Sequence, residues 1–227
     1  MLKNLTKLFF PQICHGCFAI LLAKENIICI ACRHKLPLTN HLDNSNNEAI
    51  KKFYGRIPVI HVSSMLYYHK LGVVQELIHA LKYKNHQNIG RFLGEWYAEC
   101  IKTQPFLKTV DYIIPVPLHP KKIKKRGYNQ VTTFGESLSK SLNIVYNSTI
   151  LHRQEYSISQ SKKSLHNRNT VSENTFNAEF TEAHHNKHFL IIDDVLTTGA
   201  TLEACGKAIL KIPNASISII TIAMSEN

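Results

Sequence analysis

The chain has 227 residues, 44% of them hydrophobic, and Lys plus Arg outnumber Asp plus Glu by 27 to 16, a net charge of +11. This length suits one domain of ordinary size with a small appendage, and the apolar content is enough for a buried core. No apolar run approaches the roughly 20 residues that cross a bilayer, which argues against a membrane-spanning helix. The positive charge favours phosphate-bearing ligands, nucleic acid or acidic partners.

Residues 1–10 mix two lysines with a few apolar side chains, and Pro11 follows at once. Their apolar part is shorter than the core of about 7–15 residues that a signal peptide needs. We therefore expect a short amphipathic helix here, in a cytoplasmic protein.

Residues 1–40 contain two Cys-x-x-Cys pairs, Cys14, Cys17, Cys29 and Cys32. Four thiolates at this spacing predict a closed tetrahedral Zn²⁺ site with a structural role. Disulfides are the alternative, which a reducing compartment disfavours, and iron–sulfur ligation is a second one. Cys100 and Cys205 fall in helical patterns and are expected to be small buried side chains.

The rest of the chain divides into a linker, 41–60, which begins with a polar Asn-rich stretch, and a domain, 61–227. Apolar spacing in that domain predicts helices near 73–81, 89–101, 131–142 and 201–211, and strands near 110–117, 143–153, 188–192 and 215–223. This alternation predicts an α/β fold, a doubly wound parallel sheet flanked by helices. The long polar stretch 154–174 is interpreted as a mobile functional loop or a partly disordered segment.

The most informative segment is Phe189-Leu-Ile-Ile-Asp-Asp-Val-Leu-Thr-Thr-Gly-Ala-Thr201. An apolar strand ends in two acids, and a loop from Asp193 then opens a helix near Gly199. Ligands of open α/β sheets collect at the carboxyl ends of strands, where a helix N-terminus offers bare N–H groups to an anion. Two acids beside an anion site suggest sugar hydroxyls and a bridging Mg²⁺. The alternative is a strand end with two solvated acids.

This segment resembles the motif that binds phosphoribosyl diphosphate (PRPP) in type I phosphoribosyltransferases. The resemblance implies a PRPP site made of Asp193, Asp194, Val195, Leu196, Thr197, Thr198, Gly199, Ala200 and Thr201. Other phosphate-binding patterns, G-x-x-x-x-G-K-[ST] and G-x-G-x-x-G, are absent from the sequence.

A second segment, residues 113–130, also ends a strand and opens a helix, and it carries a basic loop, Lys121-Lys-Ile-Lys-Lys-Arg126. Because parallel strands end at one edge of a sheet, we expect this loop to face Asp193 and Asp194. Its cations Lys121, Lys122, Lys125 and Arg126 would then bind a departing diphosphate. A solvated basic patch and a surface for DNA are the alternatives.

Pro-Val-Pro-Leu118 followed by Arg-Gly-Tyr-Asn-Gln130 resembles the ComF/GntX family of phosphoribosyltransferase-like proteins, which are linked to DNA uptake in competent bacteria. The resemblance extends to the four cysteines, to Leu77-Ile-His-Ala-Leu-Lys-Tyr83, and to Leu151, Arg153, Gln160, Arg168 and Phe176. The chain departs from the family pattern at Ser157, Lys163 and Val171.

The resemblance implies a type I phosphoribosyltransferase-like domain behind a zinc module, with zinc and Mg²⁺ as metals and PRPP as ligand. One hypothesis is a glycosyltransferase that passes a phosphoribosyl group to an acceptor. The other is a protein that handles single-stranded DNA alongside the competence machinery and keeps the PRPP site for a regulatory ligand. Fold-level resemblance does not choose between them.

Overall fold

The computed structural model describes residues 11–154 and 175–226. The helix expected over 1–10 and the loop residues 155–174 lie outside them. Within the described part, no helix has the length and apolarity that a membrane crossing requires.

The strands are β1 (His61–Tyr68), β2 (Tyr112–Pro115), β3 (Val145–Tyr146), β4 (Leu151–Arg153), β5 (Phe176–Ala178), β6 (His188–Leu196) and β7 (Ser216–Ser225). The helices are α2 (Ile30–His34), α3 (Glu48–Lys51), α4 (Val73–Tyr83), α5 (Gln87–Ile101), α6 (Pro120–Arg126), α7 (Thr132–Leu142) and α8 (Ala200–Ile209). The short 3-10 helices of the described residues are η1 (His41–Asp43), η2 (Pro105–Thr109) and η5 (Glu182–His184).

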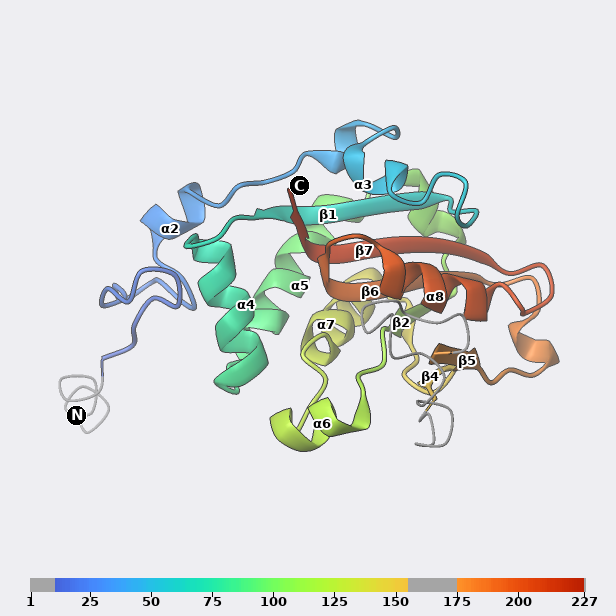
Figure 1. Cartoon of the computed structure of the whole chain (residues 1–227). Coiled ribbons are helices and arrows are strands. Elements are labelled where there is room, and N and C mark those ends of the chain that lie inside the picture. The colour runs from blue at the N-terminus through green and yellow to red at the C-terminus, as the bar shows by residue number, and fades with distance from the viewer. Residues whose placement is uncertain (1–10, 155–174, 227) are drawn as a thin grey trace, which may run out of the picture.

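Five strands form one parallel sheet in the order β1-β7-β6-β2-β3, as the alternating sequence pattern predicts (Figure 1). β6 lies in the middle, and its residues 189–192 are fully buried. Such a wholly apolar run is typical of a strand covered on both faces. The candidate site therefore lies at the end of a central, largely buried strand.

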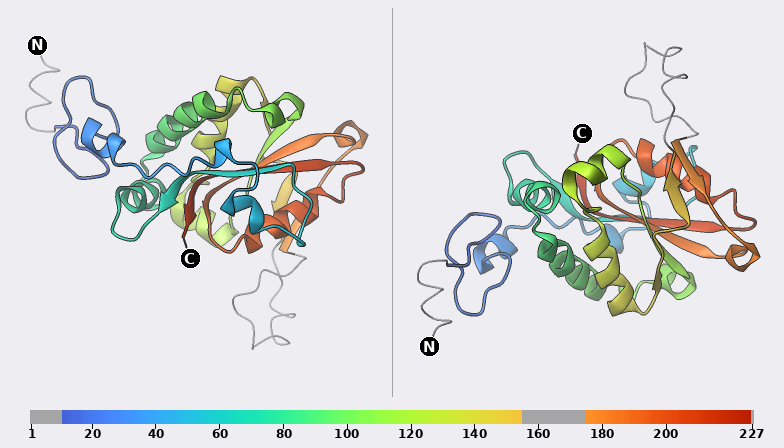
Figure 2. Two further views of the ribbon diagram at one scale, coloured as in Figure 1. Left: turned by 90° about the horizontal axis from the view of Figure 1, so that it is seen from above. Right: turned by 90° about the horizontal axis from the view of Figure 1, so that it is seen from below.

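Helices cover both faces of the sheet (Figure 2). α4, α5 and α7 pack on one face, around a core that includes Leu190 and Ile192. α8, α3 and the antiparallel pair β4–β5 pack on the other, around a core that includes Phe189 and Ile191. Alternate side chains of β6 thus enter opposite cores, as the strand period of two requires.

The strand predicted over 143–153 is wrong as a single element. β3 pairs in parallel with β2 at the edge of the main sheet, whereas β4 pairs with β5 in the small second sheet. Asn147 breaks the run, because its Oδ1 accepts hydrogen bonds from the N–H groups of Thr149 (2.8 Å) and Ile150 (3.0 Å). Asparagine stabilises turns in this way.

The segment interpreted as a linker, 41–60, is folded onto the sheet. It contains α3, and its Phe53 is fully buried against the core below α8. Asn47 Nδ2 donates to the carbonyl of Val62 in β1 at 2.9 Å, which binds the segment to the sheet edge. The division into 1–40, 41–60 and 61–227 stays a prediction.

Candidate functional site

β6 runs four residues beyond the strand that the sequence predicts. Asp193 pairs with Thr221 of β7, and Leu196 with Met224, so Asp193, Asp194, Val195 and Leu196 are strand and not loop. The sequence interpretation ended the strand at the first acid, but the neighbouring β7 extends as far and keeps the backbone paired. The predicted loop shrinks to Thr197, Thr198 and Gly199.

Gly199 makes the turn from this loop into α8. Its φ of +80° is left-handed, a conformation that glycine adopts at little cost. A Cβ at this position would lie 3.3 Å from the Phe53 ring. α8 begins at Ala200, as expected, so its first N–H groups and its partial positive charge point into the loop.

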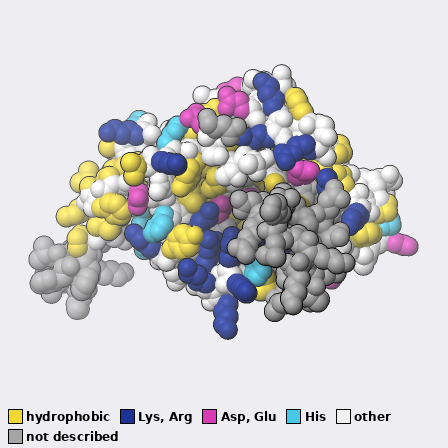
Figure 3. Space-filling view, viewed as in Figure 1, with side chains coloured by type: hydrophobic (Ala, Val, Ile, Leu, Met, Phe, Trp, Pro, Cys, Tyr) yellow, Lys and Arg dark blue, Asp and Glu magenta, His cyan; other side chains and the backbone are white. Residues whose placement is uncertain are grey.

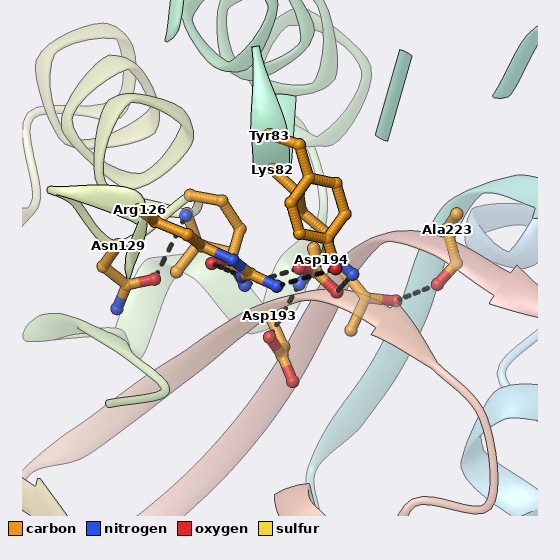
Figure 4. A network of polar contacts seen from close by, with 10 residues as sticks. Lys82, Tyr83, Arg126, Asn129, Asp193, Asp194 and Ala223 are labelled. Carbon is orange, nitrogen blue, oxygen red and sulfur yellow. Dashed lines mark hydrogen bonds and ion pairs between the residues drawn. The ribbon is translucent and has the colours of Figure 1, made fainter. Parts of the chain in front are cut away.

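Asp193 and Asp194 point to opposite sides of the strand (Figure 4). Asp194 is buried and lies on the side of α4 and α7. Its Oδ1 is 2.9 Å from the ammonium of Lys82, and its Oδ2 accepts a 2.5 Å hydrogen bond from Gln130 Nε2. Both carboxylate oxygens of Asp194 are thus engaged within the protein.

Asp193 is half-buried, and its Oδ1 accepts a 2.8 Å hydrogen bond from the backbone N–H of Asp194. Burial and the neighbouring charge of Asp194 raise the pKa of Asp193 to about 7, against the opposite effects of that N–H, Lys82 and Lys122. This carboxyl group therefore changes charge near neutral pH.

The basic loop expected at 121–126 is instead a helix, α6. Pro120 occupies its first turn, the His119 side chain accepts from the N–H of Lys121, and Gly127 ends it at a φ of +80°. These are ordinary start and stop signals for a helix. Lys and Arg side chains gather over α6 in the space-filling view (Figure 3).

Two cations of α6 lie near the pair of acids without contacting either carboxylate directly. Arg126 Nη1 donates to Gln130 Oε1 at 2.6 Å, and Gln130 in turn contacts Asp194. The Arg126 guanidinium also lies 4.9 Å from the ring centroid of Tyr83 (Figure 4). Lys122 is near enough to lower the pKa of Asp193. Among the described residues, neither Lys121 nor Lys125 contacts an acid of this site.

Three residues at the site were not assigned a role from the sequence: Lys82, Gln130 and Arg56. Lys82 and Gln130 both fall in stretches that carry the family resemblance, so a signal for them existed. Arg56 has no such signal. Its Nη1 donates to the carbonyl of Thr198 at 2.8 Å and its Nη2 lies 2.8 Å from Glu203 Oε2, which holds the loop onto α8.

The acids provide the oxygen ligands that Mg²⁺ prefers. Within the described residues, the Asp193 carboxylate accepts one hydrogen bond, from the Asp194 N–H to Oδ1. Asp193 is thus suited to bind a hard cation or sugar hydroxyls directly. Asp194 suits that role only when Lys82 leaves it.

The four cysteines near the N-terminus form one cluster, with all four Sγ atoms within 4.8 Å of one another. Tetrahedral thiolate ligands of a zinc ion stand about 3.8 Å apart, since each Zn–S bond is about 2.3 Å, and Cys17 Sγ and Cys29 Sγ are 3.7 Å apart. The cluster could therefore hold a metal ion such as zinc.

Backbone N–H groups surround the sulfur of Cys14 in this cluster. Burial raises its pKa, but N–H groups including those of Cys29 (3.2 Å) and Gly16 (3.3 Å) outweigh burial and lower the pKa to about 7. A thiolate is thus favoured at Cys14, whereas burial and the neighbouring sulfur atoms raise the pKa of Cys32. Of the two remaining cysteines, Cys205 is buried as predicted, whereas Cys100 is exposed and that prediction is wrong.

The phosphoribosyl transferase domain family matches residues 129–226. Competence protein F of Haemophilus influenzae is 29% identical over 148 residues, which cover 63% of this chain and 65% of that protein. The DNA utilization protein YhgH of Escherichia coli K12 is 27% identical over 146 residues, 63% of each chain. These matches support the resemblance to the ComF family of phosphoribosyltransferase-like proteins.

These ComF relatives are matched over less than two thirds of their own length. Among solved structures, adenine phosphoribosyltransferase from Leishmania tarentolae is 12% identical, with a TM-score of 0.39 over 80% of this chain and 89% of that one. That likeness is too distant to support a conclusion about function.

Proposed function

We propose that this chain binds PRPP together with Mg²⁺ at the carboxyl end of β6 and transfers the phosphoribosyl group to an acceptor. The observation that carries the proposal is the arrangement of structural features at the end of β6. A pair of acids is followed by a left-handed glycine and the N-terminus of α8, and cations of α6 lie opposite.

In this proposal the 5′-phosphate binds at the start of α8, where backbone N–H groups and the hydroxyls of Thr197, Thr198 and Thr201 are available. Asp193 and Asp194 bind the ribose hydroxyls. Mg²⁺, when bound, would neutralise charge on the diphosphate.

The transfer step breaks the bond between the anomeric carbon and a diphosphate oxygen. A nucleophilic atom of the acceptor bonds to that carbon, diphosphate leaves with the electron pair, and the proton of the acceptor passes to solvent. Lys121, Lys122, Lys125 and Arg126 stabilise the charge on departing diphosphate, because fixed cations act where negative charge develops.

Isothermal titration of PRPP with Mg²⁺ into the chain tests the binding. The wild type should bind, and Asp193→Asn with Asp194→Asn should lose measurable binding while the far-UV circular dichroism is kept. Glu136→Gln, an exposed acid of α7, is the matched control and should bind as the wild type does. Wild-type-like binding by the double variant would contradict the site. Diphosphate release with a panel of nitrogen heterocycles then tests transfer.

We also propose that the four-cysteine cluster holds a structural zinc ion. Four thiolates leave no open position for catalysis. The cluster sits in the core that α4 and α5 share, so the ion would stabilise that side of the domain.

A second candidate function, binding of single-stranded DNA, is favoured by α6 itself. Its four lysines, Lys121, Lys122, Lys124 and Lys125, are exposed, and no carboxylate in the described ranges lies within 4.0 Å of them. Cations of this kind bind phosphates and make affinity fall with salt. Changing all four to alanine should flatten the salt dependence of oligonucleotide anisotropy, whereas Asp193→Ala should leave it unchanged.

A further inference from the structure

Lys82 holds a position at this site that the proposed function leaves unexplained. It comes from α4, and its ammonium lies 2.9 Å from Asp194 Oδ1. The Lys82 side chain is 21% exposed and that of Asp194 is 8% exposed. A charge this deeply buried is costly without a partner, so each member of this ion pair compensates for the burial of the other.

The second oxygen of Asp194 is engaged as well, because Gln130 Nε2 donates to it. A divalent cation or a sugar hydroxyl that approaches Asp194 therefore meets a carboxylate that is already neutralised. Two cations on one carboxylate would repel each other at this short range. A cation that binds Asp194 therefore competes with the Lys82 ammonium for this carboxylate.

A hollow of about 350 Å³ lies beside Lys82 and can accommodate its ammonium group when that group moves away from Asp194. One side is a single face of α4, made by Gln75, Ile78, His79 and Lys82, which follow helical spacing. The other wall includes Val195 and Thr197, from the strand end and the loop after the two acids. The hollow thus connects Lys82 to the place where PRPP is proposed to bind.

We propose that Lys82 is the resident counter-cation of Asp194, and that a divalent cation entering with a sugar diphosphate displaces its ammonium into this hollow. The inference rests on the proposed function. It makes Lys82 a positioning residue that occupies Asp194 Oδ1 and weakens the binding of a metal ion that arrives without the sugar diphosphate. Metal and sugar diphosphate should then bind together, because only the combined ligand compensates for the lost ion pair.

Titration of Mg²⁺ alone, at fixed pH and ionic strength, tests this exchange. Lys82→Met should bind Mg²⁺ roughly tenfold more tightly than the wild type, since the competing charge is gone. Lys82→Arg should bind it no more tightly than the wild type, because a guanidinium pairs with a carboxylate through two hydrogen bonds. Lys140→Met removes the same charge from an exposed site on α7 and should match the wild type.

Equal Mg²⁺ affinity in Lys82→Met, Lys140→Met and the wild type would overturn the inference. If Lys82→Met does not fold, Lys82→Gln keeps a polar end at the site and should likewise bind Mg²⁺ more tightly than the wild type. Tighter Mg²⁺ binding by Lys82→Arg than by the wild type would also refute the exchange. These titrations contain no PRPP. A chain that fails to bind PRPP would therefore refute the proposed function without deciding the role of Lys82.

Discussion

Gln130, two residues before α7, and Asp194, near the end of β6, are joined by a 2.5 Å hydrogen bond from the amide Nε2 to the carboxylate Oδ2. The same amide accepts from Arg126 through its Oε1, so one buried side chain connects the α6 cations to the buried acid. Both ends of the amide are engaged in a fixed orientation, donor toward the acid and acceptor toward the cation.

Replacing Gln130 by Leu should uncouple α6 from the acid. The change leaves Asp194 Oδ2 without its donor inside the protein, which should lower the free energy of unfolding by roughly 1–3 kcal/mol. Urea unfolding measures this loss, and Gln104→Leu, at a half-buried position before η2, is the control. If both variants unfold alike, the hydrogen bond between Gln130 and Asp194 is not important for stability.

Gly199→Ala should lower stability and PRPP affinity together. The left-handed φ costs an alanine roughly 1–2 kcal/mol, and the added Cβ would press on Phe53 at 3.3 Å. Gly55→Ala is a close control, since its φ is +70° but no atom lies within 4 Å of the added Cβ. Gly55→Ala should lose similar stability and keep PRPP binding, so a PRPP defect in both variants would argue against a local role for Gly199.

Cys29→Ser should remove bound zinc from the purified chain and lower its melting temperature, because three thiolates no longer close the site. Elemental analysis should find one zinc per wild-type chain. Cys100→Ser, at an exposed cysteine outside the cluster, should keep both the metal and the stability. Retention of a full equivalent of zinc by Cys29→Ser would contradict the assignment.

Stability should fall in mild acid because of His61. Burial, with a smaller effect of His41, lowers its pKa from 6.5 to about 4. The unfolded chain then binds the proton more readily than the folded one between these values, so the stabilisation present above pH 6.5 is lost as the pH falls toward 4. The loss amounts to about 1.4 kcal/mol per pH unit at most.

Urea unfolding of His61→Gln across that window should give a shallower slope than the wild type. The slope should not vanish, because burial also lowers the pKa of His41 and His188. His69→Gln, at an exposed histidine just after β1, is the control and should keep the wild-type slope. An unchanged slope in His61→Gln would contradict the prediction.

The local sequence pattern predicted several helices and strands of this chain correctly and mispredicted others. The wholly apolar run 189–192 predicts a strand covered on both faces, and α4, α5 and α7 follow their apolar spacing. The end of β6 was mispredicted, because two acids look like a loop until β7 is known to pair beside them. The strand over 143–153 was mispredicted because its two halves pair with different partners.

The sequence by itself determined the class of fold. It also supplied the family resemblance and the residues of the proposed site, because strand and helix periods, the spacing of four cysteines and a run of two acids before Thr-Thr-Gly are local properties of the chain. Only the tertiary structure decided which side chains meet those acids. Lys82, Gln130 and Arg56 come from three separate segments, and the distances that matter between them depend on how α4, α6 and the segment before β1 pack on the sheet. Charge pairing and burial act through space, so no spacing along the chain records them.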